Sequence, residues 1–349
     1  IDTPVFAGKV TPKNSIIMLI ALILGLAIPA GILFLLEFFR YKIEGHNDVE
    51  KLTNLPIIAD VAIASERAKT KADIVVHENK NNLMEEIFRS LRTNLQFLLK
   101  QHDKVIMFTS TTSGEGKTFI ASNVAISFAL LGKKVILVGL DVRKPRLAEL
   151  FEIDDHHHGI TNLLVKDEVN WSDVKEQIVP SGINDKLDIL MAGPVPPNPG
   201  ELVTRESLDQ TMEQLKEHYD YILIDTAPVG LVTDTLALGR ISNATVYVCR
   251  ADFTQKASFG LINSLSMEKK LPNMSIVLNG VDLSKKKYGY YYGYGKYGKY
   301  GKYGNYGMYG SKGKYGYKSY GYGSYGSYGS YGNYSKSRYG DINDDSVKK

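Results

Sequence analysis

Residues 104–131 read KVIMFTSTTSGEGKTFIASNVAISFALL, and this stretch decides the fold. It begins as a short apolar run typical of a buried strand and ends as a helical stretch. Between them lies GEGKT at 114–118, whose glycines let backbone N–H groups turn inward around phosphate oxygens. Lys117 can reach the phosphates, and the hydroxyl of Thr118 can bind Mg²⁺. The stretch therefore predicts a phosphate-binding P-loop, although Thr111 stands where the common pattern begins with glycine.

Two aspartates lie where other predicted strands end. Asp141 lies just beyond the apolar run 134–139, and Asp225 ends the run 221–225. Ligands of open α/β sheets bind at the carboxyl ends of the strands, and Asp225 suits the Walker B role of holding Mg²⁺. Either aspartate alone would be better explained as a helix N-cap, but three motifs in this order favour a nucleotide site. The candidate metal ligands are Thr118, Asp141 and Asp225.

The rest of the chain indicates the fold class. Six short apolar runs predict buried strands: 104–110, 134–139, 187–191, 221–225, 245–249 and 275–278. They alternate with helical stretches, and the helix expected over 82–100 carries one apolar stripe, formed by Leu83, Ile87, Leu91, Leu95 and Leu98. Such alternation indicates a parallel sheet that is covered on both faces. We therefore predict an α/β P-loop NTPase with a mostly parallel sheet flanked by helices.

An uncharged apolar segment precedes this domain. The run from Ser15 to Leu36 is long enough to cross a bilayer core of ~30 Å. A signal peptide has a shorter apolar region of about 7–15 residues, and the length also disfavours a buried core helix. The run ends in EFFRYK at 37–42, and such aromatic and basic residues are typical of a membrane interface. The segment therefore predicts a transmembrane helix over residues 15–39.

Charge and composition divide the chain into two unlike parts. The formal net charge is +4, but residues 285–349 alone carry 13 Lys and Arg against 3 Asp, so the remainder is acidic. This asymmetry excludes a uniformly basic nucleic-acid binder, and the single cysteine, Cys249, excludes a disulfide framework. Of the 23 tyrosines, 19 lie at or beyond Tyr288 in a Tyr-Gly-x repeat that cannot support a packed core. We predict a disordered tail over 285–349.

Taken together, these motifs resemble those of the bacterial protein tyrosine kinases (BY-kinases) of the polysaccharide co-polymerase, or capsular exopolysaccharide, family. The resemblance covers the cytoplasmic kinase part and the last transmembrane helix, and the tyrosine-rich tail adds to it. Its matching segments are PKNS at 12–15, EIFRSLR at 86–92, the P-loop, the two aspartate motifs, and GP and PNPGEL at 193–194 and 197–202. The related MinD/ParA ATPases carry a signature lysine where this chain has Thr112, which disfavours a partitioning ATPase.

The resemblance implies roles for residues of the site. Catalysis would rest on Lys117, Asp141, Arg143 and Asp225, with ATP and Mg²⁺ as cofactors. The nucleotide-binding residues would be Ser113, Gly114, Glu115, Gly116, Lys117, Thr118 and Phe119, joined by Asn279. Asn279 occupies the position that reads adenine in related ATPases, and a plain turn residue is the alternative. One departure stands out, because the family's second motif usually reads D-x-D-x-R and Gly139 replaces its first aspartate.

The resemblance also implies a substrate and an assembly. The enzyme would phosphorylate its own tail in trans within a ring, with Glu86, Arg89 and Arg92 at the contacts between subunits. The expected phosphoacceptors are Tyr315, Tyr317, Tyr320, Tyr322, Tyr325, Tyr328, Tyr331 and Tyr334. Without kinase motifs, the tail would be better explained as an adhesive low-complexity segment. A membrane-tethered ATPase switch that regulates polysaccharide assembly is the alternative function.

Localisation and partners follow from the same resemblance. Because ATP is cytoplasmic, we expect an inner-membrane protein whose kinase domain and tail lie in the cytoplasm. Expected partners are further copies of the chain, a polysaccharide polymerase, outer-membrane export machinery, a tyrosine phosphatase and the membrane, but no nucleic acid. The chain has no initiator Met, so we expect the end of a longer protein. The expected organisation is an extracytoplasmic end (1–14), a transmembrane helix (15–39), a juxtamembrane linker (40–82), a kinase domain (83–284) and the tail (285–349).

Overall fold

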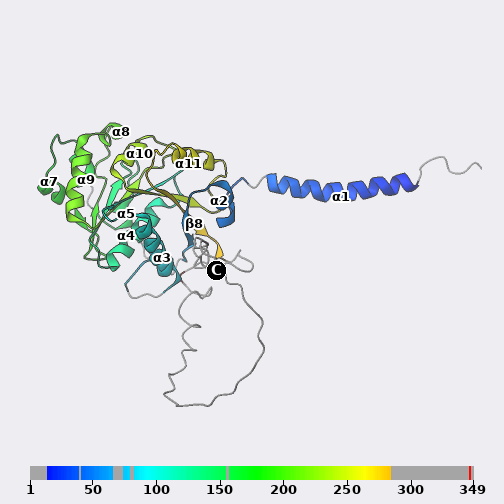
Figure 1. Cartoon of the computed structure of the whole chain (residues 1–349), viewed down its shortest axis with the longest axis horizontal. Helices are drawn as coiled ribbons and strands as arrows, with labels where there is room; N and C mark the ends of the chain where they lie inside the picture. The colour runs from blue at the N-terminus through cyan, green and yellow to red at the C-terminus, as the bar shows by residue number, and fades with distance from the viewer. Residues whose placement is uncertain are drawn as a thin grey trace, which may run out of the picture.

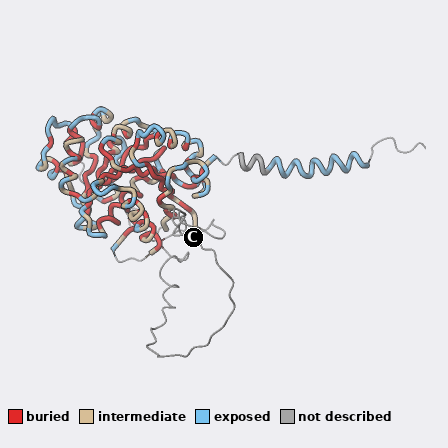
Figure 2. The backbone as a smooth tube through the Cα atoms, in the orientation of Figure 1, coloured by how far each residue is buried: buried red, intermediate tan, exposed pale blue. Residues whose placement is uncertain are grey.

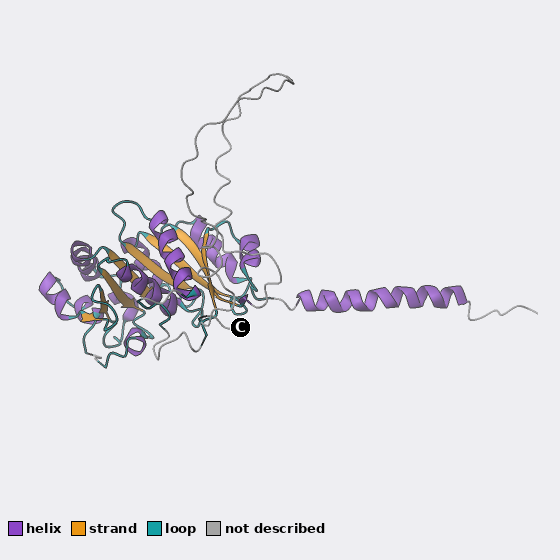
Figure 3. Ribbon diagram, turned by 90° about the horizontal axis from the view of Figure 1, so that it is seen from below, coloured by secondary structure: helices purple, strands orange, loops and turns teal. Residues whose placement is uncertain are grey.

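An eight-stranded sheet with the order β1-β8-β7-β2-β6-β3-β5-β4 organises the body of the protein (Figures 1 and 3). The structure, a computed structural model, describes residues 14–38, 41–65, 74–78, 82–154, 157–283 and 346. Its strands are β1 (Ile57–Ala62), β2 (Val105–Ser110), β3 (Val135–Leu140), β4 (Val179–Pro180), β5 (Leu187–Leu190), β6 (Tyr221–Thr226), β7 (Ala244–Arg250) and β8 (Met274–Val281). Neighbouring strands are parallel except β4 and β5. The predicted α/β fold with a mostly parallel sheet is therefore confirmed.

Helices cover both faces of the sheet (Figure 3). The helices of the body are α2 (His46–Leu52), α3 (Leu83–Leu98), α4 (Lys117–Leu130), α5 (Leu147–Leu150), α6 (Ile160–Leu164), α7 (Trp171–Glu176), α8 (Pro199–Leu202), α9 (Glu206–His218), α10 (Asp234–Ala237), the 3₁₀ helix η1 (Leu238–Ile241) and α11 (Ser258–Met267). Side chains of β2 alternate between two cores: Val105 and Met107 pack with α9 and α11, whereas Ile106 and Phe108 pack with α3 and α4. A strand buried on both faces needs a continuous apolar run, and the central strands have one.

Helix α3 shows how local sequence and packing agree. Asn82 caps it, because its Oδ1 accepts the backbone N–H of Glu85 at 2.9 Å. The buried face includes the predicted stripe from Leu83 to Leu95, and Leu98 lies partly buried at its end. Asn94 donates its Nδ2 to the carbonyl of Ile58 at 2.7 Å. The stripe therefore packs α3 on the sheet beside β1.

The folded body begins before the predicted boundary at residue 83. Strand β1 pairs in parallel with β8, and the side chains of Ile43 and Val49 are fully buried in the core. Further along, Val75 and Val76 donate their backbone N–H groups to Oδ1 of Asn123 in α4, at 2.9 and 3.1 Å. The described parts of 40–82 are thus packed against the α/β body and are not a free linker. Sequence reasoning missed β1 because its partner lies more than two hundred residues later.

Helix α1 (Asn14–Phe38) stands apart from the α/β body (Figure 1). The window Asn14–Ile32 has a mean hydropathy of 2.6 and its side chains are exposed (Figure 2). By length and composition, this helix can cross a membrane. Its bounds agree with the segment predicted from the sequence.

The tail contributes one described residue, Ser346. The eight expected phosphoacceptor tyrosines and the remainder of 285–349 lie outside the described residues.

We predict that Asn123→Ala destabilises the body by about 2–4 kcal/mol, because two buried N–H groups lose their acceptor. The measurement is chemical denaturation of the purified protein. The neighbouring Ser122→Ala variant is the control, because the buried Ser122 hydroxyl has no hydrogen-bond partner among the described residues. Equal losses of stability in the two variants would contradict the prediction.

Candidate active site

The P-loop joins β2 to α4 through two glycines in the left-handed region. Gly114 and Gly116 have φ angles of 92° and 97°, which favour glycine. A Cβ atom on Gly116 would lie 2.1 Å from Nδ2 of Asn279, so the close approach of β8 also requires glycine there. Helix α4 begins at Lys117, and the N–H groups of its first turn have no helical acceptors. This end of α4 is therefore suited to bind phosphate.

Thr111, which stands in place of the usual first glycine, has a structural partner. Its hydroxyl group is 2.9 Å from the hydroxyl group of Tyr247 in β7, and both side chains are buried. The departure from the common pattern therefore adds a bond between the start of the loop and the neighbouring strand.

The side chain of Glu115 stabilises the P-loop through hydrogen bonds. Its side chain is fully buried, and its carboxylate accepts the backbone N–H of Thr112 at 2.7 Å and the hydroxyl group of Thr254. Burial raises the pKa of Glu115, while these hydrogen bonds act in the opposite direction. The carboxylate thus ties the loop to the segment that follows β7.

Three further side chains hold the outer side of the loop. Asn279 lies inside β8, not in a turn, and its Nδ2 donates to the carbonyl of Glu115 at 3.0 Å. Arg250 donates from Nη1 to the carbonyl of Gly114 at 2.9 Å. The ring of Phe253 lies beside Gly114 and beneath the Arg250 guanidinium, 5.4 Å from Cζ to the ring centroid. Sequence analysis missed Arg250 and Phe253, although Arg250 ends a strand at the same edge as Asp225.

A buried carboxylate lies opposite the start of α4. Thr118 donates its hydroxyl to Oδ2 of Asp225 at 2.7 Å, and Asp225 and Lys117 are both buried. The other oxygen, Oδ1, is buried without a hydrogen-bond partner among the described residues. Burial raises the pKa of Asp225 to about 6, Lys117 and the Thr118 bond lower it, and Asp141 raises it. A hard cation would satisfy this oxygen.

The residues fit Mg²⁺ as a partner of bound phosphate. Asp141 directly follows β3, is half-buried, and influences Asp225 electrostatically. Its Oδ1 also accepts the backbone N–H of Lys144 at 3.1 Å. No group of three His, Cys, Asp or Glu side chains in the described ranges is placed to hold a metal alone. Mg²⁺ commonly takes one or two carboxylates together with substrate phosphates, which this donor set can provide.

Arg143 reaches a residue that sequence analysis did not select. Its Nε and Nη2 atoms lie 3.0 and 2.6 Å from Oδ2 of Asp234 in α10. A Cβ atom on Gly200 would lie 2.8 Å from Oδ1 of the same aspartate. The second aspartate motif, α10 and the PNPGEL segment therefore meet at Asp234.

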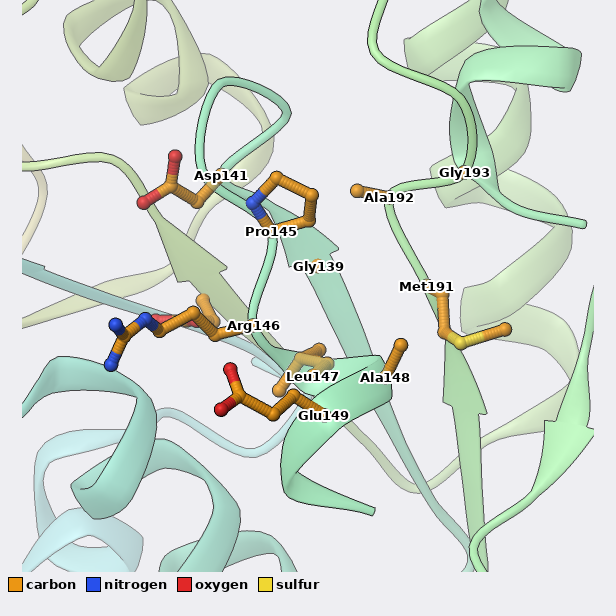
Figure 4. Close-up of a pocket in the computed structure, with 11 residues that line it drawn as sticks. Gly139, Asp141, Pro145, Arg146, Leu147, Ala148, Glu149, Met191, Ala192 and Gly193 are labelled. Atoms are coloured by element: carbon orange, nitrogen blue, oxygen red, sulfur yellow. The ribbon is translucent and has the colours of Figure 1, made fainter. Parts of the chain in front are cut away.

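A pocket of about 220 Å³ opens beside the two aspartates (Figure 4). Asp141 and Asp225 contribute to its lining, together with the charged side chains of Arg146 and Glu149. Figure 4 shows Asp141 and Arg146 on one side of the pocket and the apolar residues Met191 and Ala192 on the other. The remaining lining residues are Gly139, Pro145, Leu147, Ala148 and Gly193. The pocket thus combines an apolar wall with carboxylates.

Gly139 has little space for a side chain. It pairs with Asp225 across β3 and β6, at the rim of the nucleotide site. A Cβ atom there would lie 3.1 Å from Cδ1 of Leu147 and 3.2 Å from the backbone nitrogen of Ala192. The replacement of the family's first aspartate is therefore accompanied by close packing of α5 and the segment after β5.

The residues expected at a subunit contact do not all face outward. Glu86 and Arg89 form an exposed ion pair, with 2.8 Å between Oε2 and Nη1. Arg92 instead donates from Nη1 to the carbonyl of Ser127 in α4 at 2.6 Å. Burial, followed by the nearby Arg89, lowers the pKa of Arg92. Arg92 therefore joins α3 to α4 within the chain, whereas Glu86 and Arg89 stay exposed, and the contact between subunits remains a prediction.

We predict that Asp225→Asn stabilises the nucleotide-free protein at pH 7.5. The raised pKa means that the folded protein keeps a proton between about pH 4 and pH 6 that the unfolded chain releases. Wild-type stability therefore falls as pH rises through this window, whereas the variant lacks this dependence. Melting temperatures in EDTA across pH 5–8 measure the difference, and a variant that is less stable at every pH would refute the prediction.

We predict that Gly139→Asp does not simply restore the missing carboxylate. Overpacking against Leu147 and the Ala192 backbone should cost about 1–3 kcal/mol of stability. Denaturation midpoints of wild type, Gly139→Asp and Gly139→Ala test this. Both variants should be destabilised, since the clash begins at Cβ. A fully stable alanine variant would contradict the packing argument.

Comparison with known proteins agrees with this geometry. The model of the AAA domain family matches residues 103–278. The tyrosine-protein kinase YwqD of Bacillus subtilis is 31% identical over 226 residues, which cover 64% of this chain and 93% of that protein. The tyrosine-protein kinase etk of Escherichia coli is 26% identical over 302 residues, which cover 81% of this chain and only 40% of the relative.

A solved structure extends the similarity to three dimensions. The kinase domain of the Escherichia coli tyrosine kinase ETK is 27% identical, with a TM-score of 0.59 over 72% of this chain and all of that domain. The P-loop, the strand order and the placement of the two aspartates therefore accompany a sequence match that spans nearly the whole of a bacterial tyrosine kinase. The chain belongs to the BY-kinases, the bacterial tyrosine-protein kinases of capsule and exopolysaccharide synthesis.

Proposed function

We propose that this protein is an ATP-dependent autokinase that phosphorylates tyrosines of its own tail. The observation that carries the proposal is the pocket in which an apolar wall meets Asp141 and Asp225 beside the P-loop. Such a pocket suits a phenol ring, whose apolar body and hydroxyl group need different surroundings. The chain supplies 19 tyrosines beyond residue 287, so an acceptor is available at high local concentration.

The nucleotide would occupy the P-loop. Backbone N–H groups of residues 113–119 and Lys117 would bind the phosphates. Thr118, Asp225 and Asp141 would hold Mg²⁺, which when bound neutralises charge on the phosphates. Arg250 and Phe253 lie beside the loop, so Phe253 offers a surface on which the base could stack. Asn279 acts here through the P-loop backbone.

The transfer needs little covalent chemistry from the protein. The tyrosine oxygen bonds to the γ-phosphorus as the bond to the β–γ bridging oxygen breaks, and ADP leaves. The phenol has an ordinary pKa of about 10, so a carboxylate helps to accept its proton as the new bond forms. Asp141 suits this role because it lines the acceptor pocket and is half-buried. Lys117 would offset the negative charge that moves to the leaving oxygen.

Regulation would follow from assembly and charge. We place the kinase domain and the tail in the cytoplasm, tethered to the inner membrane by α1, with phosphorylation in trans between copies in a ring. Each phosphate adds about −1.5 to −2 to the basic tail, which can weaken its attraction to the acidic body. The process served would be synthesis and export of capsule or exopolysaccharide, with a polymerase, export proteins and a phosphatase as partners.

The first test is phosphotyrosine mapping after incubation with Mg-ATP. Wild type should acquire several tail phosphates, and Lys117→Met should lose them because the phosphates lose their buried cation. Lys175→Met, in the exposed last turn of α7, is the matched control and should behave as wild type. ATP hydrolysis without tail phosphate would favour the ATPase switch, which the absence of a carboxylate at Gly139 keeps as the alternative.

A second variant tests the acceptor pocket itself. Ala148→Phe would fill the pocket with a ring while leaving the P-loop residues unchanged. We predict that tail phosphorylation falls at least about tenfold while ATP hydrolysis persists, since only acceptor binding is blocked. Val165→Phe, at an exposed position after α6, controls for the added ring. Unchanged phosphorylation in Ala148→Phe would rule out this pocket as the acceptor site.

A further inference from the structure

One residue near the carboxyl terminus is built into the body. Ser346 is 4% exposed. Its carbonyl accepts the backbone N–H of Ser65 at 3.0 Å, and its hydroxyl accepts the backbone N–H of Met84 at 3.2 Å. Ser346 therefore lies between the segment that follows β1 and the start of α3.

The hydrogen bond to Ser346 satisfies the backbone N–H of Met84, which has no acceptor within α3. The first N–H groups of a helix have no partner within it. In α3, the Asn82 side chain takes the N–H of Glu85, and the first helical bond runs from Glu86 to the Asn82 carbonyl. The N–H of Met84, in a fully buried residue, is taken by Ser346, which acts as a second cap from the far end of the chain.

The chain leaves and re-enters the body at the same place. At the end of β8 the carbonyl of Val281 accepts the N–H of Ile63 at 3.1 Å, two residues before Ser65 binds Ser346. Val281 and Ser346, which lie on either side of the segment 284–345 with its 19 tyrosines, are thus both bound to residues 63–65.

The sequence around Ser346 differs from the repeat. The tyrosine-glycine repeat ends at Gly340, and residues 341–349 read DINDDSVKK, without glycine or tyrosine. Between 288 and 340 the chain has no Ala, Val, Ile or Leu, whereas Ile342 and Val347 flank the docked serine in sequence. Residues 341–349 therefore offer two aliphatic side chains that the repeat before them lacks.

We propose that residues 63–65 and the start of α3 form a docking site for the chain's own carboxyl-terminal segment, 341–349. Docking in cis would hold the tyrosine repeat as a loop closed at both ends on one body. The middle of a closed loop reaches about half as far as the free end of the same chain. The docked segment would therefore restrict the tyrosines nearest residue 346 and leave the middle of the repeat with the longest reach.

Hydrogen exchange of the full chain in nanodiscs tests the docking. The Lys117→Met background without nucleotide keeps phosphorylation out of the measurement, so the result does not depend on the proposed kinase activity. Truncation after Gly340 should speed exchange at both Ser65 and Met84 by at least about tenfold. Ser346→Ala should speed exchange at Met84 alone, because the backbone carbonyl that binds Ser65 remains. Ser337→Ala, in the repeat, is the matched control and should change neither amide.

Two additions complete the test. The peptide DINDDSVKK should restore protection to the truncated protein, and a scrambled peptide should not. Disulfide trapping of a Ser65→Cys/Ser346→Cys pair should give an intrachain product, and the natural Cys249 does not interfere because it is buried. Unchanged exchange after truncation would overturn the docking site, and a product found only between chains would overturn docking in cis.

Discussion

The backbone of the P-loop must keep a left-handed path at Gly114 and Gly116, and the rest of the site depends on that constraint. Hydrogen bonds from two segments that lie far from the loop in the sequence maintain it. At the end of β7 and just beyond it, Arg250 donates to the Gly114 carbonyl and Thr254 donates to the carboxylate of Glu115. In β8, Asn279 donates to the Glu115 carbonyl. Glu115 and Asn279 are buried, so these bonds also satisfy polar groups that would otherwise lack partners. The loop is therefore preorganised for phosphate before any ligand arrives, which reduces the cost of binding.

The same arrangement buries the carboxylate of Asp225, and its ionised form destabilises the folded protein. Burial disfavours its ionised form, and Lys117 and Thr118 only partly offset this effect. A structural role would be better served by a neutral residue, because buried charges without full partners destabilise a fold. Its Oδ1, which has no hydrogen-bond partner in the part of the chain that the structure describes, and its raised pKa are therefore typical of a group that acquires its partner with a ligand. Gly139, which pairs with Asp225 on the neighbouring strand, adds no further carboxylate to that of Asp141 near this charge.

Features that depend on nearby residues could be predicted from the sequence, and features that depend on distant partners could not. The residues that determine the P-loop, the central strands and the apolar stripe of α3 are contiguous in the sequence, and the structure shows all three features. Strand β1 was not predicted because its partner β8 comes more than two hundred residues later in the chain. The direction in which Arg92 points and the partner of Arg143 could not be predicted from the sequence either, since either side chain could face solvent or another element. Tertiary packing alone decides between these outcomes.

A parallel sheet explains why the nucleotide site, the end of β8 and Ser346 lie toward the same edge of the body. The carboxyl ends of β1, β2, β3, β6, β7 and β8 all meet at one edge of the sheet. The P-loop follows β2, Asp141 follows β3, and Asp225 lies near the end of β6 at that edge. The tail leaves after β8 at the same edge, and Ser346 returns beside the end of β1. With the carboxyl-terminal segment docked as proposed, the tyrosine repeat would not need to cross the body to reach a nucleotide, so its reach would be set by loop length and docking rather than by the fold.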